Sequence, residues 1–148
     1  MDQMSRARSA ARLAAVQALY QQEMEGTPLA PLLHEFHMHR LGATIEDETY
    51  AEAEVDFFSD VVKGVDARRD EIDALIAGNL AEGWAIERLD RPLRQILRAG
   101  AYELLARADI PTGSIINEYL DVAHAFYDKK EKGFVNGVLD AIARAARG

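Results

Sequence analysis

Three histidines near position 36 are the first residues in the chain that could do chemistry. His34 and His37 are three positions apart, and His39 follows two positions later. A zinc-hydrolase helix needs histidines four positions apart, with a glutamate beside the first as general base. Glu35 is present, but the histidine spacing is different and no cysteine or acidic residue stands at a convincing ligand position. We therefore expect a polar helix end and no metal site.

The sequence matches no other known metal-binding, phosphate-binding or catalytic motif that we tested against it. The acidic run Glu46–Glu48 lacks the glycine and the alternating carboxylates of a calcium loop. The glycines around Gly137 match neither the phosphate loop nor the dinucleotide fingerprint. No serine lies near a histidine in a nucleophile-elbow context. The chain has no cysteine, which excludes disulfides and thiolate chemistry. The sequence therefore predicts no cofactor and no enzyme activity.

The charge is acidic overall but unevenly distributed. A net charge of −8 argues against broad, non-specific binding of nucleic acid. The charged residues of the stretch Glu46–Asp60 are all acidic. Cations gather instead in two clusters: Arg6, Arg8 and Arg12 near the start, and Lys129, Lys130 and Lys132 near the end. Such clusters could bind RNA specifically. By charge alone, ordinary solvated end and loop segments are the better interpretation.

No stretch of the chain approaches the roughly 20 apolar residues of a membrane span. The basic start is followed by a segment that is too short and too rich in alanine for a signal peptide. We therefore expect a cytoplasmic protein.

Apolar residues recur three and four positions apart throughout, which predicts helices and no strand. The first helix should run through Ser5–Glu25 and stop at Gly26-Thr27-Pro28. Because Leu13–Tyr20 is apolar almost all round, this helix should lie in the middle of the fold. Further helices are expected at Leu29–His39, Tyr50–Ala67 and Ile72–Leu80. The next helix should begin at Asp90 or Arg91, with Pro92 in its first turn. Another should begin after Ser114 as its N-cap, and the last should follow a loop at Asp128–Gly133.

These elements make an all-α protein of six to seven helices with short connections. At 148 residues the chain is most simply one domain. The one expected subdivision falls between Leu80 and Leu89, with an N-terminal bundle over about 5–80 and a C-terminal bundle over about 85–148.

Several polar and aromatic residues lie where apolar faces begin. Asn117, Glu118 and Asn136 are expected to be hydrogen-bonded at helix ends, with Arg98 or Glu103 as partners. Among the aromatics, Tyr20 and Phe126 are expected in the core. Tyr127 and Phe134 flank the lysine cluster and could be either core or exposed.

Four segments in order carry a family resemblance: ARLAAVQALYQ (from Ala11), ILRAGAYELL (from Ile96), IPTGSIINE (from Ile110) and FVNGVLD (from Phe134). Together they resemble the NusB family of bacterial transcription antitermination factors. The resemblance implies two small helical bundles packed across each other. It also implies binding of boxA, a short single-stranded element of ribosomal RNA transcripts. The partner is NusE, a small ribosomal protein, and the pair helps the transcription elongation complex resist termination.

The resemblance also implies site residues. Arg8 and Arg12, with Arg6 nearby, match the family's RNA-binding segment, and Tyr20 matches its first-helix tyrosine. The loop that lies near RNA in the family matches Lys129–Gly133 followed by Phe134. Since Arg8 and Arg12 are four positions apart, they should share one helical face and grip successive phosphates. The lysine cluster is expected to neighbour them in space.

For the ribosomal partner, the resemblance points to Glu87, Arg91 and Arg94 beside the Leu93–Leu97 apolar face. Leu93 stands where family members usually have a polar or acidic residue, which suggests a shifted contact or a homodimer.

Two other functions remain open. The acidic charge favours a protein-only adaptor or homodimer without strong RNA affinity. The same fold also occurs as the N-terminal domain of some ribosomal RNA cytosine methyltransferases, but no nucleotide-binding domain follows here.

Overall fold

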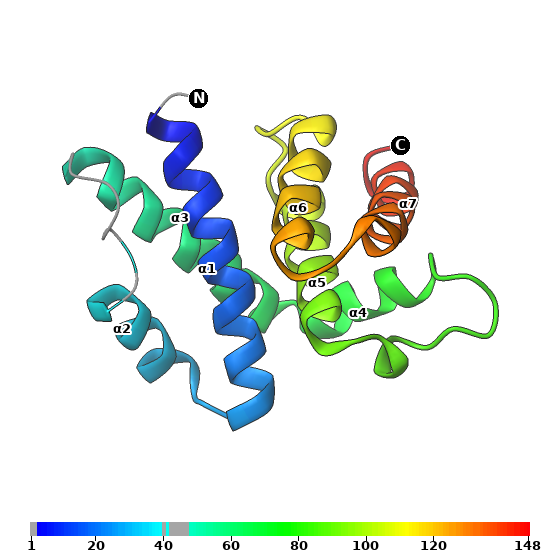
Figure 1. Ribbon diagram of the computed structural model, residues 1–148, viewed down its shortest axis with the longest axis horizontal. Helices are drawn as coiled ribbons and strands as arrows, with labels where there is room; N and C mark the ends of the chain where they lie inside the picture. The colour runs from blue at the N-terminus through cyan, green and yellow to red at the C-terminus, as the bar shows by residue number, and fades with distance from the viewer. Residues whose placement is uncertain (1–2, 40, 42–47) are drawn as a thin grey trace. The chain divides into compact units, whose positions relative to one another are not determined.

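Helices account for all the regular structure that the computed structural model describes, which comprises residues 3–39, 41 and 48–148, with side chains at 48–50 left aside. The elements in chain order (Figure 1) are α1 (Gln3–Glu25), α2 (Leu29–His39), α3 (Glu48–Ala67), α4 (Arg69–Ala77), the short 3-10 helix η1 (Ile86–Arg88), α5 (Arg91–Ala106), α6 (Thr112–Phe126) and α7 (Lys129–Arg147). The predicted all-α class is confirmed. Within these residues, no helix has the length and apolar character needed to cross a membrane. The acidic run Glu46–Glu48 falls largely outside the described residues.

The chain divides into two units, Met1–Asp66 and Ala67–Gly148. This boundary differs from the one expected between Leu80 and Leu89, because α4 belongs to the second unit. Asp73 of α4 accepts two hydrogen bonds from the Arg98 guanidinium of α5, at 2.8 and 2.9 Å. The break between α3 and α4 falls at Arg68, whose guanidinium donates two hydrogen bonds to the Glu71 carboxylate in the first turn of α4.

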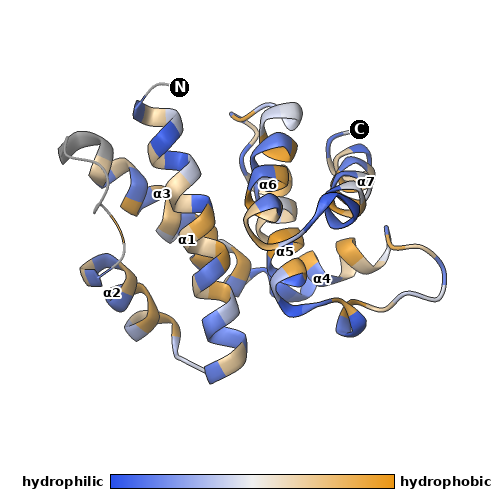
Figure 2. Ribbon diagram, viewed as in Figure 1, coloured by the Kyte–Doolittle hydropathy of each residue, from blue (hydrophilic) through white to orange (hydrophobic). Residues whose placement is uncertain are grey.

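Unit 1 (Met1–Asp66) holds α1, α2 and α3 together through side chains from all three helices. The rings of Phe36 and Phe58 stack with centroids 5.3 Å apart, which joins α2 to α3. Gln22 of α1 donates to Asp66 of α3 at 3.0 Å, and Gln21 donates to Glu35 of α2 at the same distance. Hydrophilic and hydrophobic segments alternate along each of these helices (Figure 2), as expected when one face of each is buried.

The apolar character of Leu13–Tyr20 predicts a helix in the middle of the fold, but this stretch of α1 is not buried on every side within unit 1. Gln17 is exposed and Tyr20 is 37% exposed. The buried face consists largely of small residues: Ala7, Ala11, Ala14, Ala15 and Ala18, with Val16 and Leu19. Alanines make a helix apolar on several faces, but the side chain of each has so little apolar area that exposing it to water costs little. An alanine-rich pattern therefore does not show which face is buried. The stop at Gly26 is confirmed, with a φ of +66° that a side chain rarely adopts.

In unit 2 (Ala67–Gly148), the central helix is α5. Every residue from Gln95 to Leu104 is buried, and α5 packs against α4, α6 and α7. At Gly100 the helices approach so closely that a Cβ would lie 2.9 Å from a methyl carbon of Leu139 in α7. The predicted start of α5, with Pro92 in its first turn, is confirmed.

Two helix starts in unit 2 differ from expectation. Pro111, not Ser114, precedes the first residue of α6, and Ser114 is an exposed residue of the first turn. Helix α7 begins at Lys129, directly after the extended residue Asp128. The segment expected as a lysine-rich loop is therefore the first turn of a helix. Val135, Val138, Leu139 and Ile142 give that helix a continuous buried face.

Candidate nucleic-acid interface

The N-terminal arginines lie on α1, and two of them meet a phenylalanine of α3. The guanidinium carbons of Arg8 and Arg12 lie 5.3 and 4.8 Å from the centre of the Phe57 ring. Both distances are within the range for cation–π attraction. The predicted shared face of Arg8 and Arg12 is thus present, but it faces an aromatic ring of the same unit.

The three arginines differ sharply in accessibility. Arg6 is exposed and Arg8 is half-buried, whereas only 3% of Arg12 is exposed. A direct phosphate contact from Arg12 would require its side chain to leave Phe57, so Arg6 and Arg8 are the accessible cations. Sequence reasoning missed Phe57, which comes from a distant segment. The available signal was the Phe57-Phe58 pair: since Phe58 belongs to the apolar stripe of α3, Phe57 must point elsewhere.

The second cluster is the lysine turn, which we define as Lys129, Lys130 and Lys132 in the first turn of α7. Lys129 and Lys130 are exposed, and Lys132 is half-buried. The start of a helix carries a partial positive charge and free N–H groups, which favour anions and disfavour cations. Asp128 and Glu131 partly offset this repulsion. A bound phosphate would offset it further, because lysines and helix N–H groups both attract phosphate.

Two aromatic side chains lie beside the lysine turn on unit 2. Phe134 is half-buried, and its ring centroid is 6.3 Å from that of Trp84, which is 56% exposed. Trp84 had no place among the predicted site residues. Tyr20 and Phe126, expected in the core, are 37% and 40% exposed, so that expectation was wrong. Each sits at the margin of an apolar stripe, where sequence alone does not decide exposure.

Tyr127 has a structural role at the start of α5. Its hydroxyl donates to the Asp90 carboxylate at 2.7 Å and accepts from the Leu93 N–H at 3.2 Å. Asp90 precedes the first residue of α5 and makes no side-chain cap of its own. Tyr127 therefore supplies the cap from α6. Burial, and then the hydrogen bond to Asp90, raise the pKa of the Tyr127 phenol well above its usual range.

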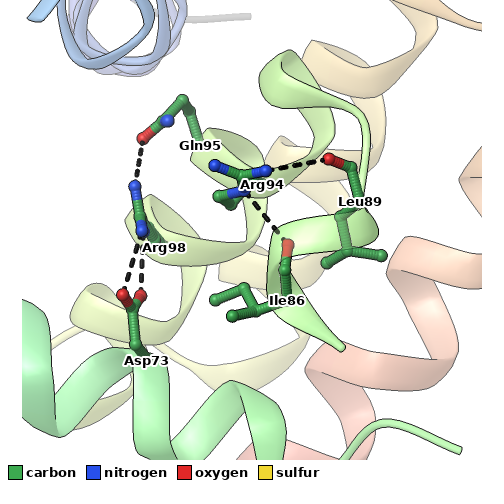
Figure 3. A network of polar contacts seen from close by, with 6 residues as sticks. All are labelled: Asp73, Ile86, Leu89, Arg94, Gln95 and Arg98. Atoms are coloured by element: carbon green, nitrogen blue, oxygen red, sulfur yellow. Dashed lines mark hydrogen bonds and ion pairs between the residues drawn. The ribbon is translucent and has the colours of Figure 1, made fainter. Parts of the chain in front are cut away.

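The residues predicted to bind the ribosomal partner lie around η1 and the start of α5. Glu87 and Arg91 are exposed, whereas Leu93 is 7% exposed. The Arg94 guanidinium donates to the carbonyls of Ile86, Glu87 and Leu89 at 3.1–3.2 Å. Figure 3 shows this side chain directed at the carbonyls of Ile86 and Leu89. Arg94 thus holds the segment before α5, which limits its freedom to reach a partner.

The buried polar network uses other partners than those expected. Asn117 and Asn136 are exposed and Glu118 is half-buried, so the two asparagines are not part of a buried network. Instead, Arg98 pairs with Asp73 and Gln95 (Figure 3), and the Tyr119 hydroxyl donates to Glu103. Arg98 and Glu103 are buried as their place in the apolar pattern indicated, at 8% and 0% exposure.

The three histidines near position 36 lie in different surroundings. His34 and His39 are exposed, and the His37 Nε2 atom lies 3.0 Å from the Ser59 hydroxyl. Among the described residues of the chain, no group of three or more His, Cys, Asp or Glu side chains is placed to hold a metal ion.

Comparison with known proteins identifies the family. The model of the NusB family matches residues 9–144. The transcription antitermination protein NusB of Sphingopyxis alaskensis is 63% identical over 147 residues, covering 99% of each chain. The corresponding protein of Novosphingobium aromaticivorans is 66% identical over 148 residues, covering 99% of this chain and 100% of the relative.

Solved structures agree. T. maritima NusB is 34% identical, with a TM-score of 0.77 over 93% of this chain and 90% of that one. A chain from the crystal structure of antitermination factors NusB and NusE in complex with dsRNA is 28% identical, with a TM-score of 0.78 over 95% and 98%. The two relatives are named as transcription antitermination proteins. The chain belongs to the NusB family of transcription antitermination proteins.

Proposed function

We propose that the chain binds boxA-type single-stranded RNA of ribosomal RNA transcripts together with the ribosomal protein NusE, and so promotes processive transcription by the elongation complex. The solved structure of antitermination factors NusB and NusE with dsRNA supports this proposal, because its matched chain covers 95% of the present one. The observation on this chain that carries the proposal is the lysine turn. Three cations sit at the positive end of a helix, where the lysines and the free N–H groups both favour an anionic ligand.

The N-terminal arginines have graded roles in this proposal. Arg6 and Arg8 are accessible and contact phosphates. Arg12, with 3% exposure, packs α1 against Phe57 of α3, and Arg8 lies over the same ring. Tyr20, which is 37% exposed, is free to stack a base, a contact worth about 1–3 kcal/mol in single-strand binding.

In unit 2 the lysine turn neutralises phosphates and Phe134 lines the surface beside it. Glu87 and Arg91 are the accessible charges for the NusE contact, and Arg94 positions them by holding the η1 carbonyls. The buried Leu93 gives no exposed apolar contact for a homodimer at that position.

A protein-only adaptor is the second candidate. The observation in its favour is the charge of unit 1, which has five Lys and Arg residues against twelve Asp and Glu residues. Such a surface repels RNA outside its few basic positions. In this alternative, NusE binds the chain equally well with and without RNA.

The test is a titration of labelled boxA-type RNA with the full chain, with and without purified NusE. The controls are a scrambled single strand and a boxA duplex, since the related crystal structure contains dsRNA. We expect the boxA single strand to bind most tightly and NusE to strengthen that binding. The logarithm of the binding constant should fall with the logarithm of salt concentration, by about 0.7 per phosphate contacted. Equal affinity for boxA and scrambled RNA, or no binding at low salt with NusE present, would refute the proposal and leave the adaptor.

A further inference from the structure

We propose that Trp84 is a base-stacking platform for the RNA strand held by the lysine turn. The inference rests on the proposed function and adds a residue to it. Trp84 is the single tryptophan of the chain and is 56% exposed. A side chain of this size usually buries most of its apolar surface, so the exposed indole leaves a large ring in water.

The turn before η1 fixes the backbone at Trp84. The backbone N–H of Trp84 donates to the Ala81 carbonyl at 3.1 Å, and Gly83 between them has a φ of +87°. Glycine adopts this conformation without the steric cost that a side chain would bring. On its other side, the indole meets the Phe134 ring, with centroids 6.3 Å apart and planes inclined at 42°. The backbone turn and Phe134 therefore support Trp84, while more than half of its surface stays open.

The neighbouring helix brings cations to the same surface. Phe134 and Lys130 are four positions apart on α7, so their side chains share one face of the helix. Since Phe134 touches Trp84, a strand whose phosphates lie along Lys130 and Lys129 has its bases within reach of the indole. Cations along the backbone and an aromatic ring for the bases are the two components of single-strand recognition.

The charge around the turn orients this strand. Glu82 is exposed next to Gly83 and would repel phosphates. The phosphates are therefore expected over the lysine turn and an uncharged base over Trp84. An acidic peptide would satisfy the lysines equally well, but it would leave the indole face without a flat partner. Among the exposed aromatics, Phe126 at 40% exposure is the matched control, because it meets Tyr127 and not Phe134.

The experiment uses the tryptophan fluorescence of the chain, excited at a wavelength that tyrosine does not absorb, so that the emission reports on Trp84, the single tryptophan. Labelled boxA-type RNA is titrated at low salt, and the anisotropy of the RNA and the tryptophan emission are recorded together. We expect both signals to change with one midpoint. Inorganic polyphosphate, which has charge but no bases, should compete for the lysines without quenching the indole in the same way.

Substitutions complete the test by RNA anisotropy. Trp84→Ala should weaken binding by about 5- to 100-fold, Trp84→Phe should restore most of the affinity, and Phe126→Ala should leave it unchanged. If RNA binds while the emission of the wild-type chain and the affinity of Trp84→Ala stay unchanged, the inference is overturned and the proposed function stands. If RNA does not bind the wild-type chain even with NusE present, the proposed function fails and the inference fails with it. Circular dichroism of each variant confirms that the surface substitutions leave the fold intact.

Discussion

Both units are built of packed helices, but they use their arginines differently. Unit 2 has twelve Lys and Arg residues against thirteen acidic ones, and three of these arginines serve its own backbone or core. Arg94 donates to the η1 carbonyls and Arg98 to Asp73. In unit 1, Arg8 and Arg12 instead lie over an aromatic ring. The number of arginines in a unit is therefore a poor measure of its capacity to bind RNA.

Arg147 is the third of these arginines and makes the most contacts. Its guanidinium donates to the carbonyls of Glu103, Leu104, Arg107 and Ile110 at 2.8–3.2 Å and to the Thr112 hydroxyl at 3.2 Å. These carbonyls belong to the last turn of α5 and to the segment after it, where the regular helical hydrogen bonds end. Those of Glu103 and Arg107 also accept a backbone N–H, from Arg107 and Ile110. The planar five-donor fork of one arginine binds all four at once. This last turn of α7 lies beyond the residues that the family model matches.

The largest expected effect separates such an arginine from a surface one. Arg147→Ala should lower the free energy of unfolding by about 3 kcal/mol, because several carbonyls lose a charged donor together. Arg144→Ala, three residues earlier, removes only an exposed ion pair to Asp140 and should cost about 0.3–0.5 kcal/mol. Urea denaturation measures both, and equal losses would contradict the distinction between an arginine that binds backbone carbonyls and one on the surface.

In unit 1 the substitution that tests the arginine contacts replaces Phe57, the ring over which they lie. Phe57→Leu removes the surface that Arg8 and Arg12 share and should cost about 2 kcal/mol, from lost cation–π attraction and poorer packing. The control Phe126→Leu, at an exposed position, should stay within about 0.5 kcal/mol of the wild type. Urea denaturation again reports both. A Phe57→Leu variant as stable as its control would mean that the two arginines gain nothing from the ring.

A pH-dependent effect tests the cap from Tyr127. Tyr127→Phe should cost about 1 kcal/mol at neutral pH, because the Leu93 N–H and the Asp90 carboxylate lose a partner. The folded pKa is raised, so folding holds the phenol proton more tightly than the unfolded chain does. The hydroxyl's contribution is therefore complete below the unfolded pKa of about 10 and declines as pH rises beyond it. Denaturation of both proteins at neutral pH and above pH 10 measures the difference, which should shrink at high pH. A constant difference would contradict the cap.

The smallest effect concerns two helical glycines of unit 2. Gly137→Ala on the exposed side of α7 meets open space and should stabilise the protein by about 0.5–1 kcal/mol. Gly100→Ala brings the same gain in helix propensity, but its Cβ would press on the fully buried Leu139. Gly100→Ala should therefore be less stable than Gly137→Ala in thermal denaturation. If both glycines gained equally, the close contact of α5 and α7 would be looser than described.

Much of the fold could be predicted because its causes are local. Gly26 ends α1, Pro92 lies in the first turn of α5, and α2 spans the predicted Leu29–His39. The start of α7 could not be predicted in this way. Three lysines and Gly133 weaken a helix locally, so only the buried face from Val135 onward, a tertiary effect, explains why the helix begins at Lys129.

The site was predictable by residue type more than by environment. The spacing of Arg8 and Arg12 placed them on one face, but the ring they meet is Phe57, more than forty positions away. Asn136 lies within the largely apolar FVNGVLD segment, but adjacent residues of a helix point in different directions. Val135 is buried, whereas Asn136 is exposed. The contacts of Trp84 and Arg147 likewise depend on segments distant in the sequence.

The salt dependence of RNA affinity tests the central claim most directly. The logarithm of the binding constant for boxA-type RNA is measured against the logarithm of salt concentration. The wild type is compared with a Lys129→Ala, Lys130→Ala, Lys132→Ala triple variant and an Arg94→Ala control. If the lysine turn contacts phosphates, the slope of the triple variant should be shallower by up to about 2, and that of Arg94→Ala should match the wild type. An unchanged slope in the triple variant would contradict the account.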